Sequence, residues 1–543
     1  MPENHPKNAI HCRCHNKHIN FTYTRRITDW IKKRPWMLWL LPVTGLISLL
    51  WFLIRVVPKP SRACYPCQRI AAPLAGGFVV WIGGLICSTF LYQRARKLMN
   101  RSKYILSGLF AGLAVLVLWI AFSSMYNKAT MAAFSPSEAS NNPIGIAKGL
   151  NPGRVTWAWD PNSTSWDGLS GYWWDDNNTS QTVVDRMVSR SIRSLSGRQT
   201  DKDAWDALFR DFNRSGKLPD EGYKSGEKIA IKINCNQDRS AQWGTGRRAQ
   251  NGLPSPHVID ALITQLISNA GVPGEDITIY EVAQGRNIGD PIYKKIRANP
   301  NPDFQAVKFV VNTDYGLSGR LGPVPDMNNP IHFAQENLPA AYLPTCVTEA
   351  KYLINLAILR PHSIFGITLC AKNHFGSLFF PNNGGWTPSP LHGAGSSRNP
   401  MDSYNCLVDL IGHRHLGGKT LLYMVDGLYP TQSNEGNVMR FASFGDDWAS
   451  SIFMSQDPIA IDSVCLDFLR NEPRATNVRG NCDNYIHEAA LADKPPSGTV
   501  YDPEGDGIAL KSLGVHEHWN NPKDRKYSRN LGTSNGIELI SLK

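Results

Sequence analysis

Three apolar stretches near the start of the chain constrain its fold more than any other feature. Trp36–Val57, Ala71–Tyr92 and Tyr104–Tyr126 contain a single charged residue between them, Arg55. Each runs for about 20 residues, which is the length that crosses a bilayer core of roughly 30 Å as a helix. The sequence therefore predicts three transmembrane helices within residues 36–126, with residues 1–35 as a cytoplasmic tail before them.

The positive charges of the chain gather around these stretches. The net charge is +12, but residues 1–128 contain only two acidic residues, Glu3 and Asp29, and the remainder is slightly acidic. A nucleic-acid-binding protein carries its basic residues on the folded domain, so we expect membrane lipid and no nucleic acid as a partner. Lysine and arginine are most frequent before the first stretch and in the second loop, which favours a cytoplasmic position for both. We therefore expect an integral protein of the inner, or cytoplasmic, membrane with its soluble domain on the extracytoplasmic side, a periplasm-like space.

Cysteines form two local groups within and before the predicted anchor. Cys64 and Cys67 make a CxxC pair in the first loop, which is the spacing of a redox dithiol or half of a metal site, and also of a structural disulfide or two idle thiols. Residues 11–18 hold closely spaced cysteines and histidines that could bind a metal or belong to a disordered tail. No CxxCxxC run for an iron–sulfur cluster is present. The cofactor stays open between a metal ion and an iron–sulfur group, with no ferredoxin motif in this chain.

Beyond a polar linker at residues 127–149, helical and strand patterns alternate. This alternation predicts an α/β domain with a mostly parallel sheet flanked by helices over residues 150–475, as one domain or two lobes, and residues 476–543 form an extension that packs on it. The expected strands are 154–159, 228–234, 277–282, 306–312, 351–359, 420–425 and 451–455, and the expected helices are 180–197, 201–212, 256–270, 403–413 and 459–469.

Polar residues follow the strand at residues 228–234. Lys232 lies within that apolar strand, so its ammonium either reaches solvent or pairs with an anion, and Asn234 comes directly after it. Arg247 and Arg248 follow a Gly-Thr-Gly turn whose backbone N–H groups would suit an anion, although a surface turn explains the same residues. Because ligands bind outside the carboxyl ends of parallel strands, these residues are candidates for anion binding.

A second set of polar residues follows the strand at residues 351–359. Arg360 and His362 come first, and Lys372, Asn373 and His374 follow within the same segment. Such a cluster can polarise a carbonyl, bind a phosphate or ligate a metal. We expect His362 and Lys372 to be catalytic, Arg360 and Asn373 to bind the substrate, and His374, with Cys64 and Cys67, to be a candidate metal ligand.

Two aspartates near the later strands have different interpretations. Asp426 ends the strand LLYMVDG at the expected edge of the site, so we expect it to be catalytic. Asp457 opens the pattern DPIAID, where an N-cap role explains it fully.

The C-terminal extension holds two further candidate patterns. Asp502, Glu504 and Asp506 alternate as calcium ligands do, but the terminal glutamate of an EF-hand loop is missing, which favours a surface loop. His516 and His518 flank Glu517, a spacing that suits a metal site on a strand face or a loop.

Several sequence blocks together resemble a known family. KINCN, SPHVIDALITQLISNAG, INLAILRPHSIFGITLCAKNHFGS, MVDG and DPIAID follow the order and spacing of the bacterial and archaeal family that contains domain of unknown function 362, over roughly residues 149–472. The resemblance implies a redox or metal neighbourhood and supports an extracytoplasmic site, but it implies no reaction. This chain departs from the family where Arg360 replaces a lysine, where His374 is inserted after the Lys372–Asn373 pair, and in lacking ferredoxin cysteines.

Three functions fit these observations. The first is a membrane-anchored, extracytoplasmic enzyme, redox-linked or metal-assisted, acting on an anionic substrate or cofactor. The second is a glycan- or protein-binding module, because residues 157–174 are dense in tryptophan and aromatic surfaces stack on sugar rings; burial in the core is the competing interpretation. The third is a structural subunit that docks to a membrane electron-transfer partner. We expect the first.

Overall fold

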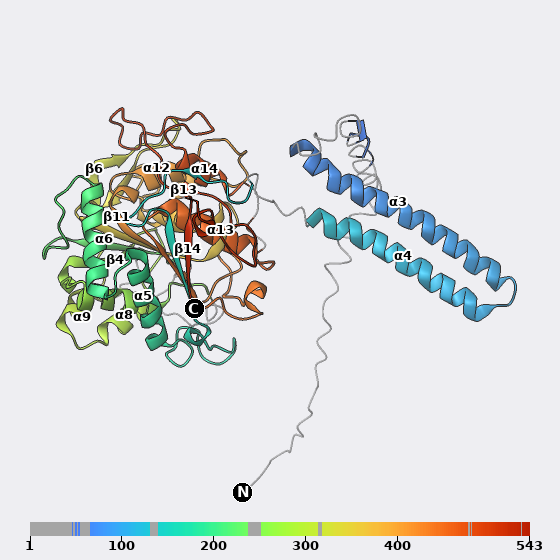
Figure 1. Ribbon diagram of the computed structural model, residues 1–543, viewed down its shortest axis with the longest axis horizontal. Helices are drawn as coiled ribbons and strands as arrows, with labels where there is room; N and C mark the ends of the chain where they lie inside the picture. Colours follow the sequence, from blue (N-terminus) through green and yellow to red (C-terminus); the bar gives the residue numbers. More distant parts are fainter. Residues whose placement is uncertain are drawn as a thin grey trace, which may run out of the picture. The chain divides into compact units, whose positions relative to one another are not determined.

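The chain divides into two compact units, Met1–Ala133 and Phe134–Lys543. The computed structural model describes residues 46, 49–51, 53–54, 66–130, 139–236, 251–312, 318–475, 478, 481–533 and 535–543, and within residues 66–130 it gives side chains only for residues 79 and 81–118. Figure 1 shows both units.

Two helices make up most of the described part of the first unit. They are α3 (Pro66–Met99) and α4 (Tyr104–Thr130), and they pack together through hydrogen bonds from Ser88 Oγ to Ala114 O at 2.9 Å and from Ser107 Oγ to Ala95 O at 2.8 Å.

The predicted transmembrane anchor is not supported by these helices. Among the described residues, none of the helices combines the length and the apolar character that crossing a membrane requires. The second and third predicted spans coincide with α3 and α4, but the last turns of α3 are charged and the side chains of residues 119–130 in α4 are not described. The first predicted span, Trp36–Val57, lies mostly outside the described residues.

An eight-stranded sheet forms the centre of the second unit, in the order β14-β2-β12-β11-β8-β3-β4-β5. From β11 to β5 all neighbouring strands are parallel, whereas β12 runs antiparallel to both β11 and β2, and β14 runs parallel to β2. The predicted α/β class is confirmed, and the sheet is mixed. Its strands are β2 (Arg154–Trp159), β3 (Ile229–Ile233), β4 (Ile277–Glu281), β5 (Lys308–Val311), β8 (Tyr352–Ile358), β11 (Thr420–Gly427), β12 (Ser451–Ser455) and β14 (Glu538–Leu542).

Apolar side chains cover both faces of this sheet. Along β8, Ile354 and Leu356 belong to one buried cluster, and Leu353 and Ala357 belong to the other. Successive side chains of a strand point to opposite faces, so a strand buried on both faces is a continuous apolar run. This explains why the central strands are recognisable in the sequence.

Helices cover each face of the sheet, as Figure 1 shows for α5, α6, α8 and α9 on one side and for α12, α13 and α14 on the other. The first group is α5 (Gln181–Ser196), α6 (Asp201–Ser215), α7 (Pro256–Thr264), α8 (Asp290–Arg297) and α9 (Pro302–Ala306), and the second is α11 (Cys370–Asn373), α12 (Cys406–Gly412), α13 (Pro458–Arg470) and α14 (Asn484–Ala490). The predicted helix 256–270 is α7 followed by a π-helical turn, Gln265–Asn269.

Local capping explains where two of these helices begin. Ser255 Oγ accepts the Val258 N–H at the start of α7, and Pro256 occupies the first helical position. Asp457 Oδ1 accepts the N–H groups of Ile459 and Ala460 at 3.0 and 2.9 Å, so the N-cap interpretation of Asp457 is confirmed.

Shorter elements complete the second unit. The short helix α10 (Thr345–Thr348) precedes β8, and three two-stranded sheets pair β1 (Ile144–Gly145) with β13 (Val515–His516), β6 (Pro325–Ile331) with β7 (Ala341–Pro344), and β9 (Arg360–His362) with β10 (Gly366–Thr368). Because β1 falls at the end of the expected linker, that segment is structured where it is described.

Most of the tryptophans at residues 157–174 lie in the interior. Trp157, Trp166, Trp173 and Trp174 are buried, and Trp157 donates to Ser451 Oγ at 2.9 Å. These rings fill the core, as the competing interpretation proposed, and they do not form an exposed surface for stacking sugars.

Candidate functional site

A cavity of about 330 Å³ opens at the carboxyl edge of the parallel strands. Its walls are built by the segments that follow β3, β4 and β8. The chain runs from β3 outward to β4 and β5, and it then returns to place β8 on the other side of β3. Such a reversal is a topological switch point, which is where open α/β sheets bind ligands.

Four of the predicted site residues line this cavity. They are Asn234, His362, Lys372 and Asn373. Lys232 and Arg360 are fully buried and hydrogen-bond to residues of the lining. The structure thus brings together polar groups from two strand ends that are far apart in sequence.

Lys232 is held by three internal acceptors. Its Nζ donates to Ile233 O at 2.6 Å, to Glu281 Oε2 at 3.1 Å and to Asn373 Oδ1 at 3.2 Å. An ammonium has three hydrogens to donate, so all are used within the protein. The anion that partners Lys232 is therefore Glu281, and the lysine ties β3, β4 and α11 together behind the cavity.

Gly376 allows this ion pair to form against the wall. A Cβ at position 376 would lie 2.2 Å from Glu281 Oε1 and 2.6 Å from Lys232 Nζ. The backbone of Gly376 also accepts the Val282 N–H at 3.0 Å. Only a residue without a side chain fits between the cavity and the buried charges, which accounts for glycine after Phe375.

Two arginines orient the asparagines that follow β3. Arg360 donates from Nη2 to Asn234 Oδ1 and from Nη1 to Gly252 O at 3.2 Å. Burial lowers the pKa of Arg360 to about 10. Arg286 donates to Asn236 Oδ1 at 2.8 Å and itself lines the cavity, half-buried. Arg286 is therefore the guanidinium placed to meet an anion in the cavity. Arg360 is not part of the lining, and its hydrogen bond fixes the position of Asn234.

Lys372 is the most unusual group of the lining. Its side chain is 8 % exposed, and its Nζ lies over the rings of Phe375 and Phe365, 3.5 and 4.5 Å from their centres. Among the described residues, Nζ has no hydrogen-bond acceptor and no carboxylate partner. Burial lowers the pKa of Lys372 well below its ordinary value, and the charges of Lys232 and Arg286 lower it further. An amine in this setting is neutral far more readily than a surface lysine.

His362 has a defined tautomer. Its Nδ1 accepts the backbone N–H groups of Ile364 at 3.0 Å and Phe365 at 3.2 Å. Burial, with Lys372, Arg360 and His392 nearby, lowers the pKa of His362 to about 2. The ring is therefore neutral with its proton on Nε2, which makes it a hydrogen-bond donor in the cavity, and the catalytic role expected for it from the sequence stays a prediction.

His392 packs against the same pair of aromatic rings as Lys372. Its ring centre is 5.9 Å from that of Phe375 and 6.0 Å from that of Phe365. Its Nδ1 lies 3.4 Å from Ser389 O, a carbonyl that can only accept, so Nδ1 carries the hydrogen and Nε2 the lone pair. Burial and Lys372 lower the pKa of His392. This half-buried imidazole is a base at neutral pH.

Asp426 occupies the predicted strand end but does not line the cavity. Its Oδ2 accepts the Ser255 N–H at 2.8 Å and its Oδ1 accepts the Leu428 N–H at 3.1 Å. Burial raises the pKa of Asp426 to about 6. Asp426 therefore links the end of β11 to the start of α7.

Among the predicted metal ligands, only His374 has a described side chain, and it does not line the cavity. His374 is fully buried, accepts from Asn355 Nδ2 at 3.1 Å, and has its pKa lowered to about 3 by burial and by Lys232. Among the described residues it belongs to no group of three potential ligands. The side chains of Cys64 and Cys67, and the predicted anion-binding residues Arg247 and Arg248, lie outside the described residues.

Some residues of the lining carried little sequence information. Glu281 ends β4 and Arg286 follows it, so both could be found by looking at the end of that strand. His392 and Trp386 come from the loop between α11 and α12, where no periodicity or motif marks them. Only the folded chain brings that loop over the strand ends.

The arrangement supplies three chemical capabilities in one cavity. Arg286 can hold a negative group, His362 Nε2–H can donate to an oxygen, and the Lys372 amine with the His392 imidazole can accept protons or attack an electrophile. A cavity of this volume suits a small molecule.

Comparison with known proteins gives one finding on family. Residues 320–467 match the model of the family described as Domain of unknown function (DUF362). The match covers Arg360, His362, Lys372, His392 and Asp426, and it supports the resemblance stated from the sequence blocks. No curated protein sequence matches the chain.

Proposed function

We propose that this chain is an enzyme that binds a small anionic carbonyl compound in the cavity and activates it with the amine of Lys372. The observation that carries the proposal is the burial of that amine against two aromatic rings, with no acceptor or carboxylate among the described residues. A lysine left without a partner in the interior lowers stability, so its presence in a cavity is best explained by chemistry.

The chemistry follows from an uncharged amine. The Lys372 nitrogen attacks the carbonyl carbon, forming a C–N bond, and one proton passes from this nitrogen through His392 Nε2 to the oxygen, which gives a neutral carbinolamine. A second proton, taken up from solvent through His392, protonates the hydroxyl group, the C–O bond breaks and water leaves, so that an iminium ion with one N–H joins Lys372 to the substrate. No electrons are gained or lost in this sequence.

The remaining groups assist this step. Arg286 pairs with the carboxylate or phosphate of the substrate, and Asn234 and Asn236 line the same wall. His362 donates its Nε2–H to the carbonyl oxygen, which increases the electrophilicity of the carbon. Its low pKa suits this role, because a neutral imidazole beside Lys372 does not raise the positive charge of the cavity.

Reductive trapping tests the proposal. Pyruvate and sodium cyanoborohydride are added to the full chain, and the modified lysine is identified by peptide mass spectrometry. We expect one adduct, on Lys372, that is absent in Lys372→Met and unchanged in the surface control Lys511→Met. Adducts spread over surface lysines, with no excess at Lys372, would contradict the proposal.

A further inference from the structure

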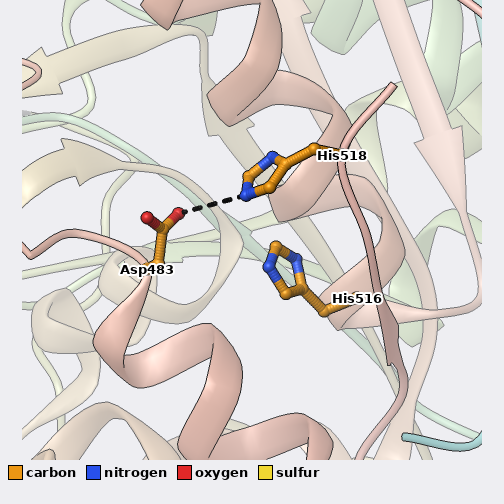
Figure 2. A group of neighbouring side chains, drawn as sticks. All are labelled: Asp483, His516 and His518. Carbon is orange, nitrogen blue, oxygen red and sulfur yellow. Dashed lines mark ion pairs between the residues drawn. The ribbon is translucent and has the colours of Figure 1, made fainter. Parts of the chain in front are cut away.

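A second cluster of reactive side chains lies away from the cavity, and none of its residues lines it. His516 ends β13, His518 follows two residues later, and Asp483 precedes the first turn of α14. One ligand atom from each lies within 4.8 Å of the others, and all three side chains are buried. Figure 2 shows the two imidazoles and the carboxylate facing one another.

Hydrogen bonds on the far side of each ring define which nitrogen faces the cluster. His518 Nδ1 lies 2.7 Å from Asp467 Oδ1, and the other oxygen of Asp467 accepts the Trp519 N–H at 3.0 Å and the Tyr527 hydroxyl at 2.9 Å. An ionised carboxylate only accepts, so His518 carries a hydrogen on Nδ1. This is the carboxylate–histidine pairing that orients metal ligands in known sites.

His516 is oriented in the same sense by a hydroxyl. Its Nδ1 lies 2.8 Å from Ser463 Oγ, and Ser463 donates its single hydrogen to Ile459 O at 2.6 Å. The serine oxygen therefore accepts from His516 Nδ1–H. In both rings the lone pair is then on Nε2, the atom that points into the cluster.

Distance and charge are both compatible with a cation. His518 Nε2 lies 3.8 Å from Asp483 Oδ1, and ligand atoms around a tetrahedral zinc ion are roughly 3.3 Å apart, given Zn–N bonds of about 2.0 Å. A small movement of side chains closes the difference. Among the described residues, Asp467 and Asp483 contribute two negative charges, and Arg470, which pairs with Asp483 at 2.5 Å, contributes one positive charge. These three residues give a net charge of −1 before an ion binds.

We propose that Asp483, His516 and His518 bind one divalent transition-metal ion of the zinc class, which joins the segment at the end of β13 to the start of α14 within the C-terminal extension. Two imidazoles and one carboxylate are a donor set that such ions favour. Burial of all three ligands suits a structural ion. His487, whose ring centre is 5.0 Å from that of His516, borders the site.

The same geometry has a metal-free interpretation, in which a protonated His518 bridges Asp467 and Asp483. The two interpretations predict different zinc contents for the purified protein. The full chain is purified without a histidine tag, saturated with ZnCl₂, desalted and measured by inductively coupled plasma mass spectrometry. Because the N-terminal cysteines and histidines can also bind zinc, the zinc held at this site is measured as the difference in zinc content between the wild type and each variant.

We expect His518→Ala and His516→Gln to hold one zinc ion per chain fewer than the wild type. His257→Ala is the matched control, because His257 is a buried histidine that also pairs with a carboxylate, Asp176, at 2.8 Å. We expect this control to keep the wild-type zinc content. A content equal in all four proteins would overturn the proposal.

Thermal unfolding of the wild type keeps the test decisive if a variant fails to fold. An ion that binds only the folded chain raises the midpoint of unfolding. We expect excess ZnCl₂ to raise the midpoint of the C-terminal unit in the wild type and in His257→Ala, and excess EDTA to reverse the rise. No shift with ZnCl₂ in the wild type would contradict the proposal, whatever the outcome of the trapping experiment at Lys372.

Discussion

The Nζ of Lys372 lies 3.5 Å from the centre of the Phe375 ring, in the wall of the cavity. A protonated amine would be attracted to the ring face, but that attraction does not replace the water lost on burial. The pKa of Lys372 is lowered well below 10.5 for this reason. The folded chain therefore carries a lysine that favours its uncharged form.

Replacing Lys372 with methionine is expected to stabilise the protein near neutral pH. In the unfolded chain the lysine is protonated, and in the folded chain its burial disfavours the proton, so folding loses stability below the unfolded pKa of about 10.5. We expect Lys372→Met to raise the free energy of unfolding by about 1–3 kcal/mol at pH 7. The gain should shrink as the pH approaches 10.5. Urea unfolding at several pH values measures it, and a loss of stability at every pH would contradict the account.

The buried pair of Lys232 and Glu281 predicts strong coupling between two substitutions. Removing one partner leaves the other charge unpaired in the interior, which costs about 3–5 kcal/mol. We expect Lys232→Met and Glu281→Leu each to reduce stability by that order, and the double variant to lose less than the sum of the two. A double-mutant cycle from urea unfolding gives the coupling energy. Additive losses would show that the two side chains act independently.

Gly376→Ala is expected to disturb the same ion pair from the cavity side. The new methyl group would approach Glu281 Oε1 and Lys232 Nζ within about 2–3 Å, and we expect a loss of about 2–4 kcal/mol in the free energy of unfolding. Gly393→Ala is the control, because a Cβ at position 393 meets no atom within 4 Å. Equal stability of the two variants would refute the steric argument.

His362 is expected to remain neutral across the range in which most histidines titrate. Its pKa is lowered to about 2, mainly by burial, so the proton should stay on Nε2 between pH 4 and 9. Long-range ¹H–¹⁵N NMR correlations of the imidazole ring report the tautomer, and His362→Gln assigns the resonance. A titration midpoint near 6.5 would exclude the donor role proposed for this ring.

The sequence predicted which strand ends form the site better than it predicted the interaction partner of each side chain. Central strands such as β3 and β8 are buried on both faces, so their apolar runs were recognisable. Rules for parallel sheets then placed Asn234 and His362 at one edge. The anion beside Lys232 could not be known, because identifying Glu281 requires the pairing of β3 with β4, in which Lys232 lies opposite Tyr280.

Other features depended on contacts between distant segments. Asp426 followed the strand rule, but its carboxylate accepts the backbone N–H of Ser255, the N-cap of α7 and a residue far earlier in the chain. The alternate spacing of His516 and His518 indicated a metal site, but Asp483 had no pattern to mark it. The apolar stretches predicted a membrane anchor from length alone, and the described parts of α3 and α4 do not bear it out.

Competitive acetylation of the lysines over pH 6–11 tests the central claim most directly, because the rate at each residue follows its uncharged fraction. The full chain is labelled with trace acetic anhydride at each pH, and Lys372 is compared with the exposed Lys511 by peptide mass spectrometry. We predict that the midpoint for Lys372 falls well below that of Lys511. Coincident midpoints would show that Lys372 is an ordinary ammonium and would remove the basis for amine chemistry in the cavity.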